Sequence, residues 1–284
     1  MRPFVYRMLV PALSRMLIYL FHLRIDHAVW IIYAGSALGF YYAARYLILA
    51  FTDDNGKAAF LAALCHELIY IILFKEGKIY DMATAFFFTL CLAFLARRKF
   101  VLYCIVFVVA SLNRETTFIL AIFFAVYFIR HIPFRQYFYM GVFQFMAYFM
   151  IRAGIMAAFA NRPGTAFLLR PAQNIRMFLD DPISTTIILA SAAILFIFIF
   201  HKWEQKSYFL RSAFFIMVPI QIILHLMMGW GMELRVYAET FPIMILLAGA
   251  IKAHEPRATL CFPRIRSQPM PQTEPQKQPE PRSA

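Results

Sequence analysis

The sequence is poor in charge and in glycine. Only 15% of its 284 residues are Asp, Glu, Lys or Arg, and only 10 are glycine. No Gly-rich phosphate-binding loop of the P-loop or dinucleotide-binding type occurs, and no internal repeat is visible. The sequence therefore gives no sign of a nucleotide-binding domain or of a repeat architecture.

Cysteine is also scarce, and its positions exclude two further classes of site. Of the four cysteines, Cys65, Cys91 and Cys104 lie inside apolar segments, and Cys261 lies near the C-terminus. There is no CxxC pair and no His/Cys cluster at the spacing of metal ligands. We interpret the cysteines as small apolar fillers, and they suggest neither a disulfide framework nor a zinc site.

Hydrophobic residues make up 62% of the chain and aromatic residues 18%. This is more apolar surface than one soluble core can bury, and several windows reach the roughly 20 apolar residues that a helix needs to cross a bilayer. The sequence predicts an all-α, polytopic integral membrane bundle with about eight to nine membrane-embedded helices. We expect residues 1–253 to form this membrane domain and 254–284 to form a disordered, Pro-rich cytoplasmic tail.

The net charge of +13 does not indicate a nucleic-acid partner, because the cations are scattered between apolar segments. We interpret them as topology signals and contacts to anionic lipids. Short basic loops at 97–99, 130–135 and 201–206 are typical of the cytoplasmic side, which suggests a multi-pass protein of the inner (plasma) membrane. The crossing segments on this topology are 28–51, 57–74, 80–96, 137–159, 183–200, 208–228 and about 240–252.

Residues 100–129 must then leave the cytoplasmic side and return to it within about 30 residues. We expect a short helical hairpin with its turn at "NRET", residues Asn113 to Thr116, near the outer surface. The alternative is one helix about 45 Å long, which contradicts the positive-inside pairing. The first residues, 2–24, predict an amphipathic helix in the outer interface that Pro11 interrupts; a weak crossing helix is the alternative.

On this topology the unusual polar residues gather on the outer side, and each has a structural explanation beside a functional one. Asp81 could cap the helix that follows it. Arg114 and Glu115 could hold the hairpin turn as an ion pair, but ionisable groups at membrane depth are functional candidates by default. Arg235 and Glu239, four residues apart, could pair along one helix face. A convergence of acids and arginines on one side suggests a site.

Four segments carry a family resemblance: "RPFVYRMLVPAL", "GKIYDMATAFFF", "SLNRETTFIL" and "ELRVYAETFPI". In this order they resemble membrane proteins of the GT-C superfamily, which move a sugar from a polyprenyl-phosphate carrier on the extracytoplasmic face. The resemblance implies a bilayer and a polyprenyl-phosphate-linked sugar as partners, and a divalent metal ion as a cofactor compatible with this chemistry. The carboxylates it implies for catalysis are Asp81, Glu115 and Glu233. The cations it implies for phosphate binding are Arg7, Arg114 and Arg235. Supporting roles fall to Tyr80, Asn113 and Glu239.

The start of the chain departs from that family. Its members usually begin with a transmembrane helix and an acidic outer loop, whereas this chain starts at the segment resembling "PFVYRML". We expect either a truncated start or a member without the usual acid. Two rival hypotheses stay open: a transporter or lipid-binding membrane protein that uses the same residues, and a non-catalytic relative with a structural role.

Overall fold

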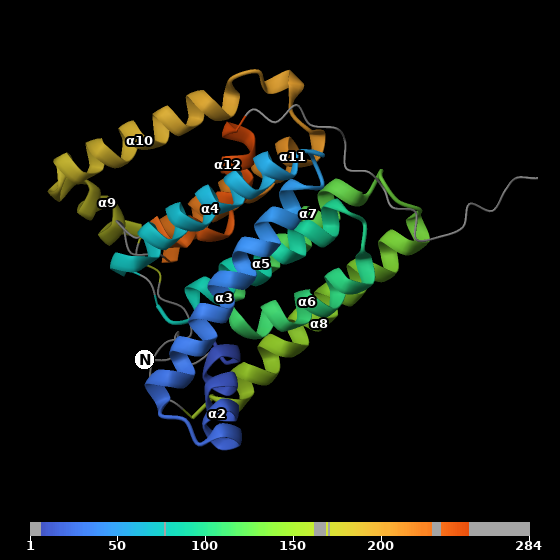
Figure 1. The fold of residues 1–284 in the computed structure, drawn as a ribbon, viewed down its shortest axis with the longest axis vertical. Coiled ribbons are helices and arrows are strands. Elements are labelled where there is room, and N and C mark those ends of the chain that lie inside the picture. Colours follow the sequence, from blue (N-terminus) through green and yellow to red (C-terminus); the bar gives the residue numbers. More distant parts are fainter. Residues whose placement is uncertain (1–6, 77, 162–168, 170, 229–233, 250–284) are drawn as a thin grey trace, which may run out of the picture.

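The computed structural model describes residues 7–76, 78–161, 169, 171–228 and 234–249, and every regular element among them is a helix. Glu233 and the tail 254–284 lie outside the described residues. In chain order (Figure 1) the elements are α2 Leu9–Phe21, α3 Ile25–Ile48, α4 Asn55–Glu76, α5 Asp81–Ala96, α6 Phe100–Asn113, η1 Glu115–Thr117, α7 Phe118–Phe128, α8 Phe134–Ala158, α9 Pro171–Asp180, α10 Pro182–Phe200, η2 Trp203–Gln205, α11 Tyr208–Met228, η3 Leu234–Glu239 and α12 Phe241–Ala248.

Four of these helices are long and apolar enough to cross a membrane: Asn55–Leu73 within α4, then α8, α10 and α11. The structure does not confirm the expectation of about eight to nine membrane-embedded helices, because several other apolar helices are shorter than the roughly 20 residues of a full crossing. The chain is thus an all-helical protein, over its described residues, with four candidate membrane-spanning helices.

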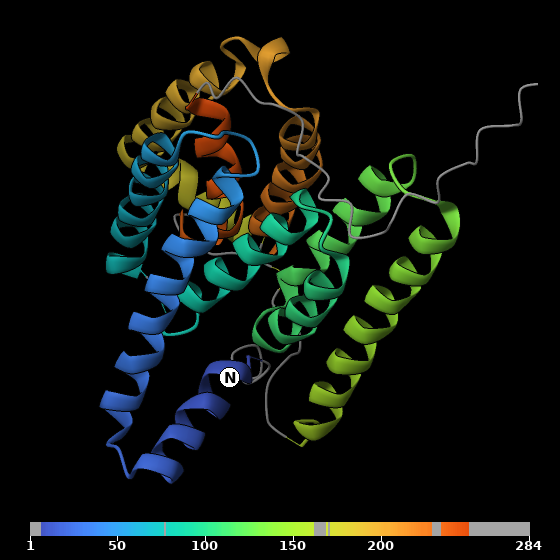
Figure 2. The same cartoon turned by 45° about the vertical axis from the view of Figure 1, so that its right-hand side comes forward.

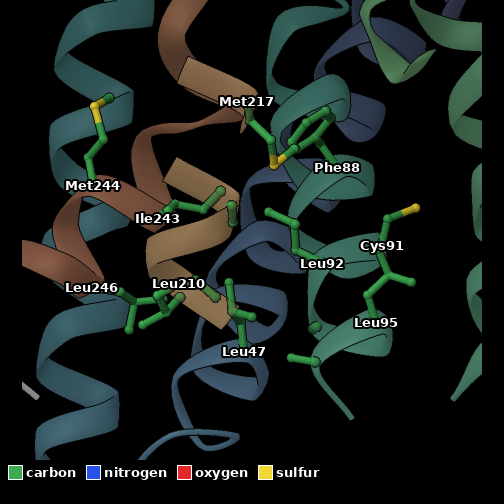
Figure 3. Close-up of a cluster of buried hydrophobic side chains, with 14 of the residues drawn as sticks. Leu47, Phe88, Cys91, Leu92, Leu95, Leu210, Met217, Ile243, Met244 and Leu246 are labelled. Carbon is green, nitrogen blue, oxygen red and sulfur yellow. The ribbon is translucent and has the colours of Figure 1, made fainter. Parts of the chain in front are cut away.

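Helix α5 is the centre of the bundle. It packs against α3, α6, α7 and η3, and most of its side chains are buried, including Phe88 and Leu92. Figure 3 shows these residues meeting Leu47 of α3, Met217 of α11 and Ile243 of α12. Close packing of this kind, rather than exclusion from water, holds helices together in hydrocarbon.

Helices α8 and α10 have the opposite character, because their surfaces are apolar and exposed. Only Gln144 and Ile155 are buried on α8, and only Ile199 is buried on α10. Figure 2 shows α8 along one edge of the bundle. Continuous exposed apolar surface is unusual in a water-soluble monomer and suits contact with lipid.

Residues 100–129 form two helices separated by a break, and not one long helix. Arg114 is extended, with φ −149 and ψ 145, and its amide donates to the carbonyl of Ala110 at 3.1 Å. The two helices run in opposite directions, since the ring of Phe100 at the start of α6 lies 5.5 Å from that of Phe128 at the end of α7. The reversal places Arg114 and η1 together at one end of the bundle.

The connections of the bundle define two ends. At the basic end, the guanidinium of Arg97 donates to the carbonyl of Tyr46 at 3.0 Å, and Tyr127 of α7 meets Tyr208 of α11 with ring centroids 5.8 Å apart. The predicted cytoplasmic loops 97–99, 130–135 and 201–206 all belong to this end. The starts of α3 and α5, the α6–η1 turn and η3 belong to the other, which we call the ion-pair end.

The helix expected near the N-terminus forms over Leu9–Phe21, folded back beside α3 (Figure 2). The expectation that Pro11 interrupts it was wrong. Pro11 lies in the first turn, where the missing N–H has no intrahelical acceptor to lose. Ser14 faces the protein while Leu20 and Phe21 are exposed, so this helix presents an apolar face outward.

The contact between α3 and α5 gives a test of the packing. A Cβ on Gly39 would lie 2.9 Å from the ring of Phe86, whereas a Cβ on Gly35 meets nothing within 4 Å. We expect Gly39→Leu to lower the apparent unfolding temperature in detergent, because overpacking costs about 1–3 kcal/mol. Gly35→Leu is the matched control on the same helix. Equal unfolding temperatures for the two variants would contradict the α3–α5 packing described above.

Candidate functional site

Four charged side chains meet inside the protein at the ion-pair end. Asp81 is the first residue of α5, Arg114 joins α6 to η1, and Arg235 and Glu239 lie on η3. Arg114 Nη1 lies 3.5 Å from Asp81 Oδ1 and 3.3 Å from Glu239 Oε1. Arg235 Nη1 lies 3.0 Å from Asp81 Oδ2. We call this group the buried network.

The buried network is removed from solvent and balanced in charge. The side chains of Asp81 and Glu239 are 0% exposed, and those of Arg114 and Arg235 are 5% and 7% exposed. Two acids thus face two guanidinium groups. Burying charge is tolerated only when it is paired and hydrogen-bonded, and removing one partner from such a group is costly.

Neutral donors complete the coordination of both buried carboxylates. The backbone amide of Lys78 donates to Asp81 Oδ2 at 2.7 Å, so Asp81 closes the turn before α5 as well as binding two arginines. The hydroxyl of Thr116 donates to Glu239 Oε1 at 2.6 Å, and Gln221 Nε2 donates to Glu239 Oε2 at 3.4 Å. Sequence analysis missed Gln221; its only signal is an amide inside the apolar run of α11.

A second ion pair lies beside the buried network and reaches the surface. Arg7 Nη2 lies 3.2 Å from Glu115 Oε1, and the side chain of Glu115 is 46% exposed while that of Arg7 is 11% exposed. The guanidinium of Arg7 stacks over the ring of Tyr80 at 4.3 Å. Such cation–π contact orients Arg7 toward Glu115.

Two residues of α8 support the same edge of the site. The hydroxyl of Tyr148 donates to the carbonyl of Glu115 at 2.9 Å. Arg152 Nη2 donates to the carbonyl of Ser111 at 2.6 Å, and its guanidinium lies 5.7 Å from the centre of the Tyr148 ring. A second cation therefore stands near Glu115.

The environments of Glu115 and Glu239, which lie outside the four candidate spans, move their pKa values in opposite directions. Burial raises the pKa of Glu239, and Arg114 opposes this only in part. Desolvation acts to raise the pKa of Glu115 as well, but the guanidinium of Arg7, with smaller contributions from Arg114 and Arg152, lowers it overall. Glu115 is therefore held ionised at the surface of the site.

The structure brings together eight of the nine residues proposed from the sequence. Asp81, Arg114, Arg235 and Glu239 form the buried network, and Arg7 and Glu115 form the second pair. Tyr80 contributes the ring under Arg7, and Asn113 Nδ2 donates to Thr84 Oγ1 at 2.8 Å. The ninth, Glu233, lies outside the described residues.

Arg235 and Glu239 do not pair with each other along an α-helix, as their spacing of four had suggested. Arg235 binds Asp81, Glu239 binds Arg114, and η3, which carries both, is a 3-10 helix.

Within the described parts of the chain, no three His, Cys, Asp or Glu side chains are grouped so that they could hold a metal ion. Comparison with protein-family models, with curated proteins and with solved structures gave no match.

The buried network gives a stability test. We expect Asp81→Asn to destabilise the protein by about 3–5 kcal/mol, because it leaves two buried guanidinium groups facing one carboxylate. Asp26→Asn is the matched control: Asp26 pairs with Arg24 at 3.8 Å, but the two side chains are 71% and 80% exposed. Such a pair contributes about 0–1 kcal/mol. Chemical unfolding in a mild detergent measures both, and an equally small effect of the two changes would contradict the network's structural role.

Proposed function

We propose that the chain is an integral membrane glycosyltransferase of the GT-C type. It moves a sugar from a polyprenyl-phosphate donor to an acceptor hydroxyl on the extracytoplasmic face. The observation that carries the proposal is the pair formed by Glu115 and Arg7: a half-exposed carboxylate 3.2 Å from a guanidinium. Transfer from a lipid phosphate requires a base and a cation side by side.

The burial of the site residues divides their roles. Asp81 and Glu239 are enclosed and bound by arginines, so they position the site and do not touch substrate. Arg114 and Arg235 are likewise engaged by these carboxylates. Among the site carboxylates that the structure describes, Glu115 is the one that solvent reaches. In this proposal Glu115 is the catalytic base and Arg7, with Arg152 nearby, binds the donor phosphate.

The reaction can be written on these groups. The carboxylate of Glu115 takes the proton of the acceptor hydroxyl while that oxygen bonds to the anomeric carbon of the sugar. The bond between the anomeric carbon and the phosphate oxygen breaks, and its electron pair stays on the departing polyprenyl phosphate. Arg7 stabilises that charge, since a guanidinium offers several donors that match phosphate oxygens.

The buried network supports this chemistry by holding the turn that carries Glu115. Arg114 immediately precedes Glu115 and is tied to α5 and η3, and Thr116 immediately follows it and donates to Glu239. Two anchored neighbours limit the freedom of the residue between them. A base held in place contributes more than a mobile one.

Glu115→Gln tests the proposal directly. We expect transfer from a polyprenyl-phosphate-linked sugar, followed with a labelled donor in reconstituted membranes, to fall by about 10²–10⁴-fold, since an amide cannot accept the proton. The amide can still accept a hydrogen bond from Arg7, so the fold should persist, which thermal unfolding would check.

Glu204→Gln is the control for that experiment, because Glu204 is 90% exposed and lies at the basic end. It should leave transfer unchanged. Full transfer by a folded Glu115→Gln variant would eliminate Glu115 as the base and remove the main support for the enzyme.

A second candidate function is a lipid-phosphate-binding protein that performs no chemistry. It is favoured because the two acids of the buried network are paired with its two arginines, so neither acid is available as a base. It predicts that a polyprenyl phosphate binds the wild-type protein and that no sugar is transferred to any acceptor. Donor binding with no turnover would favour this alternative over the enzyme.

A further inference from the structure

We propose that the basic end carries a binding groove for one anionic phospholipid, formed by α7, η2 and α11. The groove encloses about 360 Å³ and is lined by Tyr127, Trp203, Tyr208, Arg211, Ser212 and further apolar side chains. It is formed by the end of α7 and the first half of α11, whereas Thr116 precedes α7 and Gln221 lies in the second half of α11, so it is separate from the ion-pair end.

Arg211 is the cation of the groove. Its guanidinium lies 5.9 Å from the ring centre of Trp203 and 6.0 Å from that of Tyr208, and its Nε atom is buried without a hydrogen-bond partner among the residues that the structure describes. That atom is enclosed, but the side chain as a whole is 24% exposed and lines the groove, so an anionic oxygen there would accept hydrogen bonds from the other N–H groups of the guanidinium.

The ion pair of Arg211 with Glu204 does not prevent Arg211 from binding an anion. Glu204 Oε2 lies 3.4 Å from Arg211 Nη1, but the side chain of Glu204 is 90% exposed, and such a pair is weak in water. The nearby Lys206 is already engaged, because its ammonium donates to the carbonyls of Phe198 and Ile199 at the end of α10. The ring of His131 stacks on that of Tyr208, with ring centroids 5.8 Å apart.

A lipid fits the rest of the groove better than a soluble anion does. Apart from Arg211 and Ser212, its lining is aromatic or aliphatic and includes Phe215 and Ile216, one helical turn beyond Arg211. Arg211 lies in the first turn of α11, which is a candidate membrane span. The first turn of a span lies at the depth of the lipid headgroups. The volume suits a headgroup and the first part of a chain and is too small for a whole lipid.

The charge of this end selects an anionic headgroup. Its neighbouring loops contribute the cations Arg97, Arg98, Lys99, Arg130 and Lys202. A phosphatidylglycerol headgroup carries net negative charge, whereas phosphatidylcholine is zwitterionic. Surface attraction brings anionic lipid to the whole basic end, and Arg211 would then hold one molecule in the groove.

Native mass spectrometry of the full chain in detergent tests the proposal, with phosphatidylglycerol and phosphatidylcholine of identical acyl chains. We expect the wild-type protein to retain phosphatidylglycerol at least threefold more than phosphatidylcholine. Arg211→Gln should abolish that preference. Arg135→Gln, which removes an exposed cation from the same end but not from the groove, should preserve it.

Ser212→Trp provides an independent variant, because it keeps Arg211 and fills the groove; we expect it to reduce retention of both lipids. A phosphatidylglycerol preference that survives Arg211→Gln, or retention unchanged by Ser212→Trp, would overturn the proposal. Displacement of phosphatidylglycerol by an equal concentration of soluble glycerol phosphate would also overturn it, since it would identify a site for free phosphate.

Discussion

The pairing of two acids with two arginines inside the ion-pair end is the interaction on which the site depends. Hydrocarbon gives helices little reason to associate through hydrophobicity, so packing and polar contacts must specify which segments meet. Arg114 binds Asp81 and Glu239 together, and Arg235 adds a second bond to Asp81. These contacts join α5, the α6–η1 turn and η3. Since an unpaired charge buried inside the protein is costly, the three segments are held in one arrangement.

That arrangement determines which acid can meet a substrate. The turn places Arg114 inward, between α5 and η3, and Glu115 outward, where Arg7 and solvent reach it. Neighbouring residues of one motif therefore have different roles, one in holding the structure and one in the proposed chemistry. The same division explains the opposite pKa shifts of Glu115 and Glu239, because one faces several guanidinium groups at the surface and the other is enclosed.

The two ends of the bundle differ in what their charges do. At the ion-pair end acids and arginines neutralise one another inside the protein. At the basic end cations predominate, and Arg211 lies in a groove among aromatic rings. The apolar middle, with Phe88 and Leu92 at its core, separates the two groups. The two groups of charges lie far apart along the helices, so each end can bind a different polar group independently.

The sequence by itself determined the helices and the break between two of them. Long apolar runs ending at basic loops predicted segments such as 183–200 and 208–228, which the structure bounds at Pro182–Phe200 and Tyr208–Met228, and "NRET" marked the reversal. Only the tertiary structure decided that Arg235 binds Asp81, 154 positions away, and that Gln221 reaches Glu239. It also decided that Glu115 is open to solvent while Asp81 and Glu239 are enclosed. Local composition sets helix formation, whereas pairing and exposure depend on how distant segments pack.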